Sequence, residues 1–121
     1  MTAELVAFLR TQLDEDERVA SAAADHSTTE WAACDEGDVN MVGTGGNGFL
    51  ATGPWGGSLR KSGVHMARWD PTRVLAEIDA KRRILDLGPG YGGYNDAWSD
   101  AVHALAQPYA GREGWREEWK A

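Results

Sequence analysis

Apolar side chains recur at helical spacing near the start of the chain. The positions are Leu5, Phe8, Leu9 and Leu13. They are three or four residues apart, so they share one face of an α-helix, and the run Asp14–Glu17 makes another face acidic. Thr2 is placed to cap this helix, and residues 25–29 are typical of a helix end. The pattern predicts an amphipathic N-terminal helix.

The pattern then changes to short β-like runs. These runs are Trp31–Cys34, Val39–Val42 and Phe49–Thr52. Turn-forming residues separate them at 35–38 and 43–48. We therefore expect a small antiparallel β-meander over about residues 30–52.

Two helices are predicted in the second half. Asp70 is placed to cap a helix, and Pro71 occupies the first helical position, where its missing amide hydrogen costs nothing. The apolar spacing continues this helix to about residue 87, and Gly88 and Pro89 end it. A shorter helix is expected from about Asn95 to Pro108, followed by a C-terminal tail at 109–121.

Composition indicates how these elements are organised. The chain has 121 residues, of which 42% are hydrophobic, which suits one domain spanning 1–121. Its 15 glycines favour turns, so we expect glycine-rich loops at 43–63 and 88–95. The predicted fold class is α+β, a small meander packed with an N-terminal helix, an Asp-Pro-capped helix over about 70–87 and a short C-terminal helix.

Two glycine motifs resemble cofactor sites. Gly43–Gly48 has the GxGxxG spacing of dinucleotide-binding loops, but a strand and a turn follow it where that motif requires a helix. Ile84–Gly92 resembles the first motif of Rossmann-like methyltransferases that use S-adenosylmethionine. Only 29 residues follow Gly92, too few for the remaining βα units of that fold. We expect no cofactor.

Other catalytic chemistry has weak support. The three histidines and Cys34 match no zinc-ligand spacing, so no metal is predicted. No GxSxG elbow is present around a serine nucleophile. The remaining cluster of titratable groups is His65, Arg68 and Asp70, near the start of the Asp-Pro-capped helix. We predict that the protein is not an enzyme.

Charge and cysteine content limit the partners. The net charge of −7 opposes direct nucleic-acid binding, which depends on Lys and Arg neutralising phosphates. No apolar run is long enough for a membrane span. The single Cys34 can form no internal disulfide, and no signal peptide is recognised, so we expect a cytoplasmic protein.

Tryptophan suggests a binding surface. Trp and Arg dominate the energetics of protein interfaces, and the chain has six Trp. The candidates beside loops or ends are Trp55, Trp69, Trp115, Arg116 and Trp119. Packing of these rings in a small core is the alternative explanation.

The sequence also resembles a family of short uncharacterised proteins of actinobacteria and their phages. The resemblance rests on three regions covering roughly half of the chain. They are Leu5–Arg10 with Asp14–Glu17, Val64–Glu77 with Lys81–Leu85, and Leu105–Ala110 with Arg116–Trp119. The most specific segment is His65-x-Ala67-Arg68-x-Asp70-Pro71-x-Arg73-Val74-Leu75, together with the C-terminal Arg116-Glu117-Glu118-Trp119. The resemblance implies an origin and no activity.

We therefore expect a non-enzymatic protein-interaction or accessory protein of phage, prophage or actinobacterial origin, whose partner is another protein. The alternative is a protein that binds a small ligand or nucleotide through a glycine-rich loop. A homo-oligomer is a third possibility, because a small domain can bury an amphipathic helix against a second copy.

Overall fold

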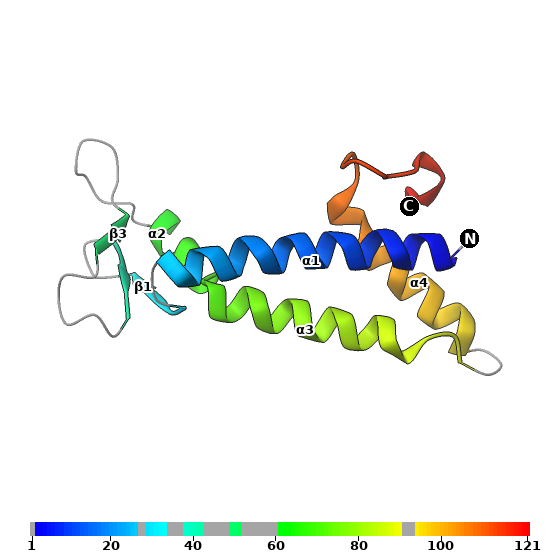
Figure 1. The fold of residues 1–121 in the computed structure, drawn as a ribbon, viewed down its shortest axis with the longest axis horizontal. Coiled ribbons are helices and arrows are strands. Elements are labelled where there is room, and N and C mark those ends of the chain that lie inside the picture. Colours follow the sequence, from blue (N-terminus) through cyan, green and yellow to red (C-terminus); the bar gives the residue numbers. More distant parts are fainter. Residues whose placement is uncertain (1, 27–28, 34–37, 43–48, 52–60, 91–93) are drawn as a thin grey trace. The chain divides into compact units, whose positions relative to one another are not determined.

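The computed structural model of the chain describes residues 2–26, 29–33, 38–42, 49–51, 61–90 and 94–121. Four α-helices, three short strands and two 3₁₀ turns lie in this part of the chain (Figure 1). The helices are α1 (Thr2–His26), α2 (Lys61–Arg68), α3 (Pro71–Leu87) and α4 (Tyr94–Ala106). The strands are β1 (Trp31–Ala33), β2 (Val39–Met41) and β3 (Phe49–Ala51), and the 3₁₀ turns are η2 (Gln107–Tyr109) and η3 (Glu117–Trp119). The predicted α+β class, with an N-terminal and a C-terminal helix, is confirmed.

The chain divides into two compact units. Unit 1 comprises residues 1–16 and 78–121, and unit 2 comprises residues 17–77. The expectation of a single domain stays a prediction. The two units are described in turn.

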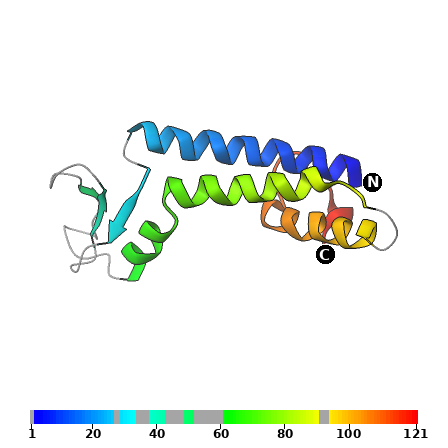
Figure 2. The same cartoon turned by 90° about the horizontal axis from the view of Figure 1, so that it is seen from below.

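Unit 1 has a helical core. Its buried side chains come from the first turns of α1, the end of α3, α4 and the C-terminal segment. They are Leu5, Phe8, Leu9, Leu13, Ile78, Leu85, Val102, Ala106, Tyr109 and Trp119. Within this unit α1 lies beside α3 and α4 in both views (Figures 1 and 2). The apolar stripe predicted for the first helix is therefore a core face.

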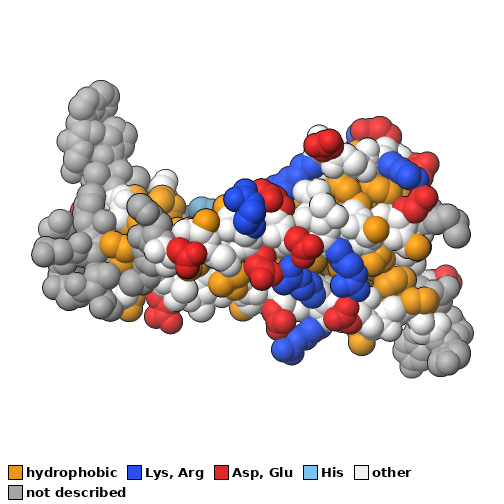
Figure 3. Space-filling view, in the orientation of Figure 1, with side chains coloured by type: hydrophobic (Ala, Val, Ile, Leu, Met, Phe, Trp, Pro, Cys, Tyr) orange, Lys and Arg blue, Asp and Glu red, His pale blue; other side chains and the backbone are white. Residues whose placement is uncertain are grey.

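Ion pairs line the outside of the same helices. Arg10 pairs with Asp86 at 2.9 Å and Arg82 with Asp14 at 2.7 Å, so both pairs join α1 to α3. Acidic and basic side chains are interspersed on this face (Figure 3). Exposed pairs of this kind contribute at most about 1 kcal/mol each, so burial of the apolar core dominates the stability of the unit.

The C-terminal segment, 107–121, packs on unit 1. Phe8 of α1 contacts both Trp115 and Trp119, with ring centroids 5.8 and 5.3 Å apart. The Gln107 amide donates to the Trp119 carbonyl oxygen at 2.8 Å and accepts from the Ala121 amide at 3.2 Å. Trp119 is 4% exposed. The segment predicted as a tail is thus part of the core.

Unit 2 contains the sheet. The strand order is β1-β2-β3 and both pairings are antiparallel, which confirms the predicted meander. Trp31 pairs with Met41 in β1 and β2, and the register shifts between Val39 and Asn40 where β2 meets β3. Helix α2 packs against β1 and β2. Val39 is fully buried.

The predicted loops need correction where they overlap helices. Residues 61–63, assigned to the first glycine-rich loop, form the first turn of α2, and Gly63 is buried there. The second predicted loop, 88–95, ends earlier, because Tyr94 and Asn95 begin α4. The rest of the first loop is β3 or lies outside the described residues, as residues 91–93 do.

Among the described helices, none combines the length and the apolar character that crossing a membrane requires.

Candidate functional site

Asp70 anchors a junction in unit 2. Its Oδ1 accepts from the Arg73 amide at 2.9 Å, which is the N-cap interaction predicted for α3. Its Oδ2 accepts from the Trp31 amide at 3.1 Å, 39 residues earlier. One carboxylate therefore caps a helix and holds the first residue of the sheet.

Thr72 reinforces this junction. Its amide and its hydroxyl both donate to the Thr29 carbonyl oxygen, at 2.9 and 3.1 Å. Two hydrogen bonds from Thr72 therefore attach the backbone just before β1 to the first turn of α3. The turn that joins α2 to α3, where Trp69 lies, has rigid support.

Trp69 projects from this support as an exposed aromatic ring. It is 44% exposed. The Arg73 guanidinium lies over the ring at 4.4 Å from the centroid, and the His65 ring lies 6.4 Å from it at 49°. Arg73 Nε also pairs with Glu77 at 2.9 Å. These neighbours hold the indole in one place and leave part of its surface open.

Helix α2, which leads into Trp69, carries further exposed side chains. Val64 is 50% exposed, and Arg68 is exposed at the end of α2. We call the set Val64, His65, Arg68, Trp69 and Arg73 the Trp69 surface. It combines apolar and cationic groups.

Among the described residues, no side-chain contact joins His65, Arg68 and Asp70, which were predicted to form one cluster. Asp70 uses both oxygens on backbone amides, which assigns it a structural role. His65 is a neighbour of Trp69, and Arg68 is exposed on α2.

The other predicted interface residues lie elsewhere. Trp119 is buried in unit 1, and Trp115 is half-buried against Phe8 and Trp119. Arg116 pairs with Glu4 and lies 5.5 Å from the Trp119 ring. Trp55 lies outside the described residues. Packing on α1 is thus shown for the two C-terminal indoles, and binding by them stays a prediction.

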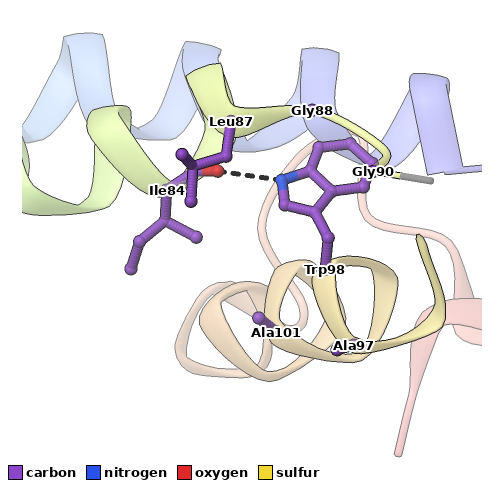
Figure 4. A pocket seen from close by; sticks show the side chains of 7 residues that line it. All are labelled: Ile84, Leu87, Gly88, Gly90, Ala97, Trp98 and Ala101. Carbon is purple, nitrogen blue, oxygen red and sulfur yellow. Dashed lines mark hydrogen bonds between the residues drawn. The ribbon is translucent and has the colours of Figure 1, made fainter. Parts of the chain in front are cut away.

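Unit 1 has an apolar cavity at the end of α3. It is open to solvent on one side, has a volume of about 410 Å³ and is lined by Ile84, Leu87, Gly88, Gly90, Ala97, Trp98 and Ala101 (Figure 4). Trp98 Nε1 donates to the Ile84 carbonyl oxygen at 2.8 Å, satisfying one of the last carbonyls of the helix. Gly88 adopts φ +65°, a left-handed conformation typical of a helix C-terminus. Ile84–Leu87 is thus helical, as expected, and unlike the strand of a methyltransferase motif.

Within the described ranges, no three His, Cys, Asp or Glu side chains are grouped so that they could hold an ion. The expectation of a protein without metal or cofactor stays a prediction.

Sequence reasoning missed two members of the Trp69 surface, Val64 and Arg73. A signal was present, because Val64 and Arg68, and His65 and Trp69, are each four residues apart. Reading residues 53–63 as a continuous loop concealed that helical spacing.

Comparison with known proteins gives one match. Residues 2–121 match a family described as "Family of unknown function (DUF6221)". No curated protein sequence matches the chain significantly, and neither does any solved structure.

Proposed function

The chain belongs to this family of unknown function, and we propose that it is a non-enzymatic protein-binding module whose contact site is the Trp69 surface. The carrying observation is the 44% exposed indole of Trp69 beside Arg73. Tryptophan and arginine are the residues most enriched among interface hot spots. An accessory role in actinobacteria or their phages is the accompanying proposal, and it rests on the sequence resemblance.

The energetics favour this site over the other indoles. A partner that covers the open part of Trp69 removes on the order of 100 Å² of mostly apolar surface from water, worth about 2–3 kcal/mol. Trp119 is only 4% exposed, so a partner could cover almost no further surface of its ring. Among the tryptophans that the structure describes, Trp69 is the most exposed and therefore has the most apolar surface for a partner to cover.

Rigid presentation adds to this argument. Ordering a flexible side chain on binding costs about 0.5–1.5 kcal/mol. Here Arg73 and His65 flank the ring, and Asp70 and Thr72 fix the backbone around it. The Trp69 side chain therefore loses less conformational entropy on binding than a flexible side chain would.

Affinity capture followed by titration tests the proposal. The wild-type chain and a Trp69→Ala variant are used as bait for actinobacterial proteins, and each captured protein is titrated against both. We expect the variant to bind about 10–100-fold more weakly, the equivalent of about 1.4–2.8 kcal/mol. Its circular dichroism spectrum should match that of the wild type.

A matched variant controls for loss of any exposed apolar group. Val42→Ala removes a side chain that is 43% exposed and lies outside the Trp69 surface, so it should leave affinity unchanged. Equal binding by the wild type and Trp69→Ala would refute the proposed site.

The cavity at the end of α3 favours a second candidate function, small-ligand binding. Its lining is largely apolar, which suits an aliphatic or aromatic molecule and gives little support for a nucleotide. Calorimetry with S-adenosylmethionine, NAD and ATP, alongside an apolar probe such as indole, separates these ligands. Ala101→Phe fills the cavity from α4 and should abolish any heat of binding that arises there.

A further inference from the structure

Helix α2 carries basic side chains and no acidic one. Lys61, His65 and Arg68 are four and three residues apart, so they form a strip along one side of the helix, and all three are exposed. Trp69 adjoins this strip, because its ring centroid lies 6.4 Å from that of His65. The basic strip therefore borders the apolar part of the Trp69 surface.

The acidic residues that follow α2 in the sequence make contacts of their own. Residues 61–77 contain two, Asp70 and Glu77. Asp70 accepts from two backbone amides, and Glu77 pairs with Arg73. Within this stretch the exposed charge of α2 is consequently positive.

This sign is opposite to that of the whole chain, whose net charge is −7. Electrostatic interactions at physiological ionic strength are screened over about 8 Å. A partner bound on α2 therefore interacts more strongly with the charges of the basic strip than with acidic residues farther away. Local complementarity selects a negatively charged partner.

We infer that the Trp69 surface, together with Lys61 of the basic strip, takes an acidic protein segment, in which Asp or Glu side chains pair with Lys61 and Arg68 while a neighbouring aliphatic or aromatic side chain covers Trp69. This inference rests on the proposed function and names the class of partner. Carboxylates match the guanidinium of Arg68 well, because its planar fork can donate two parallel hydrogen bonds.

Peptide selection on the full chain tests the inference. Random 12-residue peptides are displayed and selected on the immobilised wild-type chain, and individual peptides are titrated against Trp69→Ala and against the double variant Lys61→Gln/Arg68→Gln. We expect the selected peptides to be enriched in Asp and Glu beside an apolar residue. Each variant should weaken their binding about tenfold or more, and added salt should weaken binding to the wild type.

A double variant with the same charge change serves as control. Arg83→Gln/Lys120→Gln also removes two exposed basic side chains, both in unit 1, and should leave peptide affinity unchanged. An equal loss in this control would show a general charge effect and overturn the inference.

The remaining outcomes separate the two proposals. Selected peptides that need Trp69 but are neutral or basic would keep the proposed function and overturn the acidic segment. Failure to obtain any Trp69-dependent peptide would count against the proposed function itself. Binding of a dT12 oligonucleotide or of phosphatidylserine vesicles that requires Lys61 and Arg68, with no acidic peptide selected, would overturn the inference in favour of that other ligand.

Discussion

The Tyr109 hydroxyl donates a 2.6 Å hydrogen bond to Asp16 Oδ2, across 93 residues of sequence. Tyr109 is 4% exposed, and burial is the main reason that its pKa lies well above the ordinary value of about 10. The hydrogen bond to Asp16 and the charge of Asp16 raise the pKa further, and Arg112 partly opposes them. Tyr109 therefore joins the C-terminal segment to α1 as a neutral phenol.

This raised pKa predicts a loss of stability at alkaline pH. The folded chain holds the phenol proton more tightly than the unfolded chain, so the contribution of Tyr109 is fully present below about pH 10 and falls as pH rises toward the folded pKa. Urea unfolding of the wild type and of Tyr109→Phe, measured between about pH 8 and 11.5, checks this. The free energy of unfolding of the wild type should fall more steeply above pH 10. Parallel curves would contradict the prediction.

Buried Trp119 and exposed Trp69 should differ in how much free energy of unfolding is lost when each is replaced by alanine. Trp119→Ala removes a buried ring from the cluster with Phe8 and Trp115, so we expect a loss of about 3–5 kcal/mol in the free energy of unfolding. Trp69→Ala removes a ring that is 44% exposed and should cost about 1 kcal/mol or less. Urea denaturation of both variants gives the comparison. Similar costs would mean that Trp69 is a core residue, which would also weaken its assignment as a contact site.

The double role of Asp70 predicts a graded response to substitution. Asp70→Ala loses both acceptors, and the helix cap alone is worth about 1 kcal/mol, so we expect a total cost of about 2 kcal/mol. Asp70→Asn keeps one carbonyl oxygen and should cost about half as much. Hydrogen exchange at the Trp31 and Arg73 amides, together with urea unfolding, would show which bond each variant loses. If Asn is as stable as Asp, the bond to Trp31 contributes nothing.

Two glycines in the C-terminal segment predict a backbone effect. Gly111 and Gly114 have φ values of +85° and +89°, which side-chain-bearing residues rarely adopt. A Cβ at Gly111 would meet nothing within 4 Å, and one at Gly114 would lie 3.5 Å from Phe8 Cδ2, an ordinary contact. Alanine at either position should therefore cost a similar amount, about 1–3 kcal/mol, from backbone strain alone. Thermal unfolding of the two variants tests this, and a much larger loss for Gly114→Ala would indicate crowding against Phe8.

The parts of the fold that were predictable are those set by local sequence. The Asp70 cap acts three residues ahead on the Arg73 amide, and the apolar spacing of α1 is visible within a few turns. Helix α2 has eight residues and begins within a glycine-rich stretch. Its buried Gly63 serves packing, whereas glycine content by itself favours a turn.

The remaining features depend on distant partners. Arg116 meets Glu4 across 112 residues, and the Asp70–Trp31 bond spans 39. No pattern in a short window carries this information. The sequence likewise leaves Trp69 and Trp119 equivalent as candidates, because a tryptophan can serve a core or an interface and its tertiary neighbours decide which.

The aromatic cluster of unit 1 has a spectroscopic consequence. Trp119 Nε1 is buried, and no described residue accepts a hydrogen bond from it. A buried indole emits at shorter wavelength than one in water. The emission maximum of Trp119 should therefore lie at shorter wavelength than that of the exposed Trp69. Emission at the blue edge would then follow the burial of Trp119 in unit 1. The part of the red-edge emission that Trp69→Ala removes would report on the Trp69 surface, and a solute or partner that covers this surface would change it.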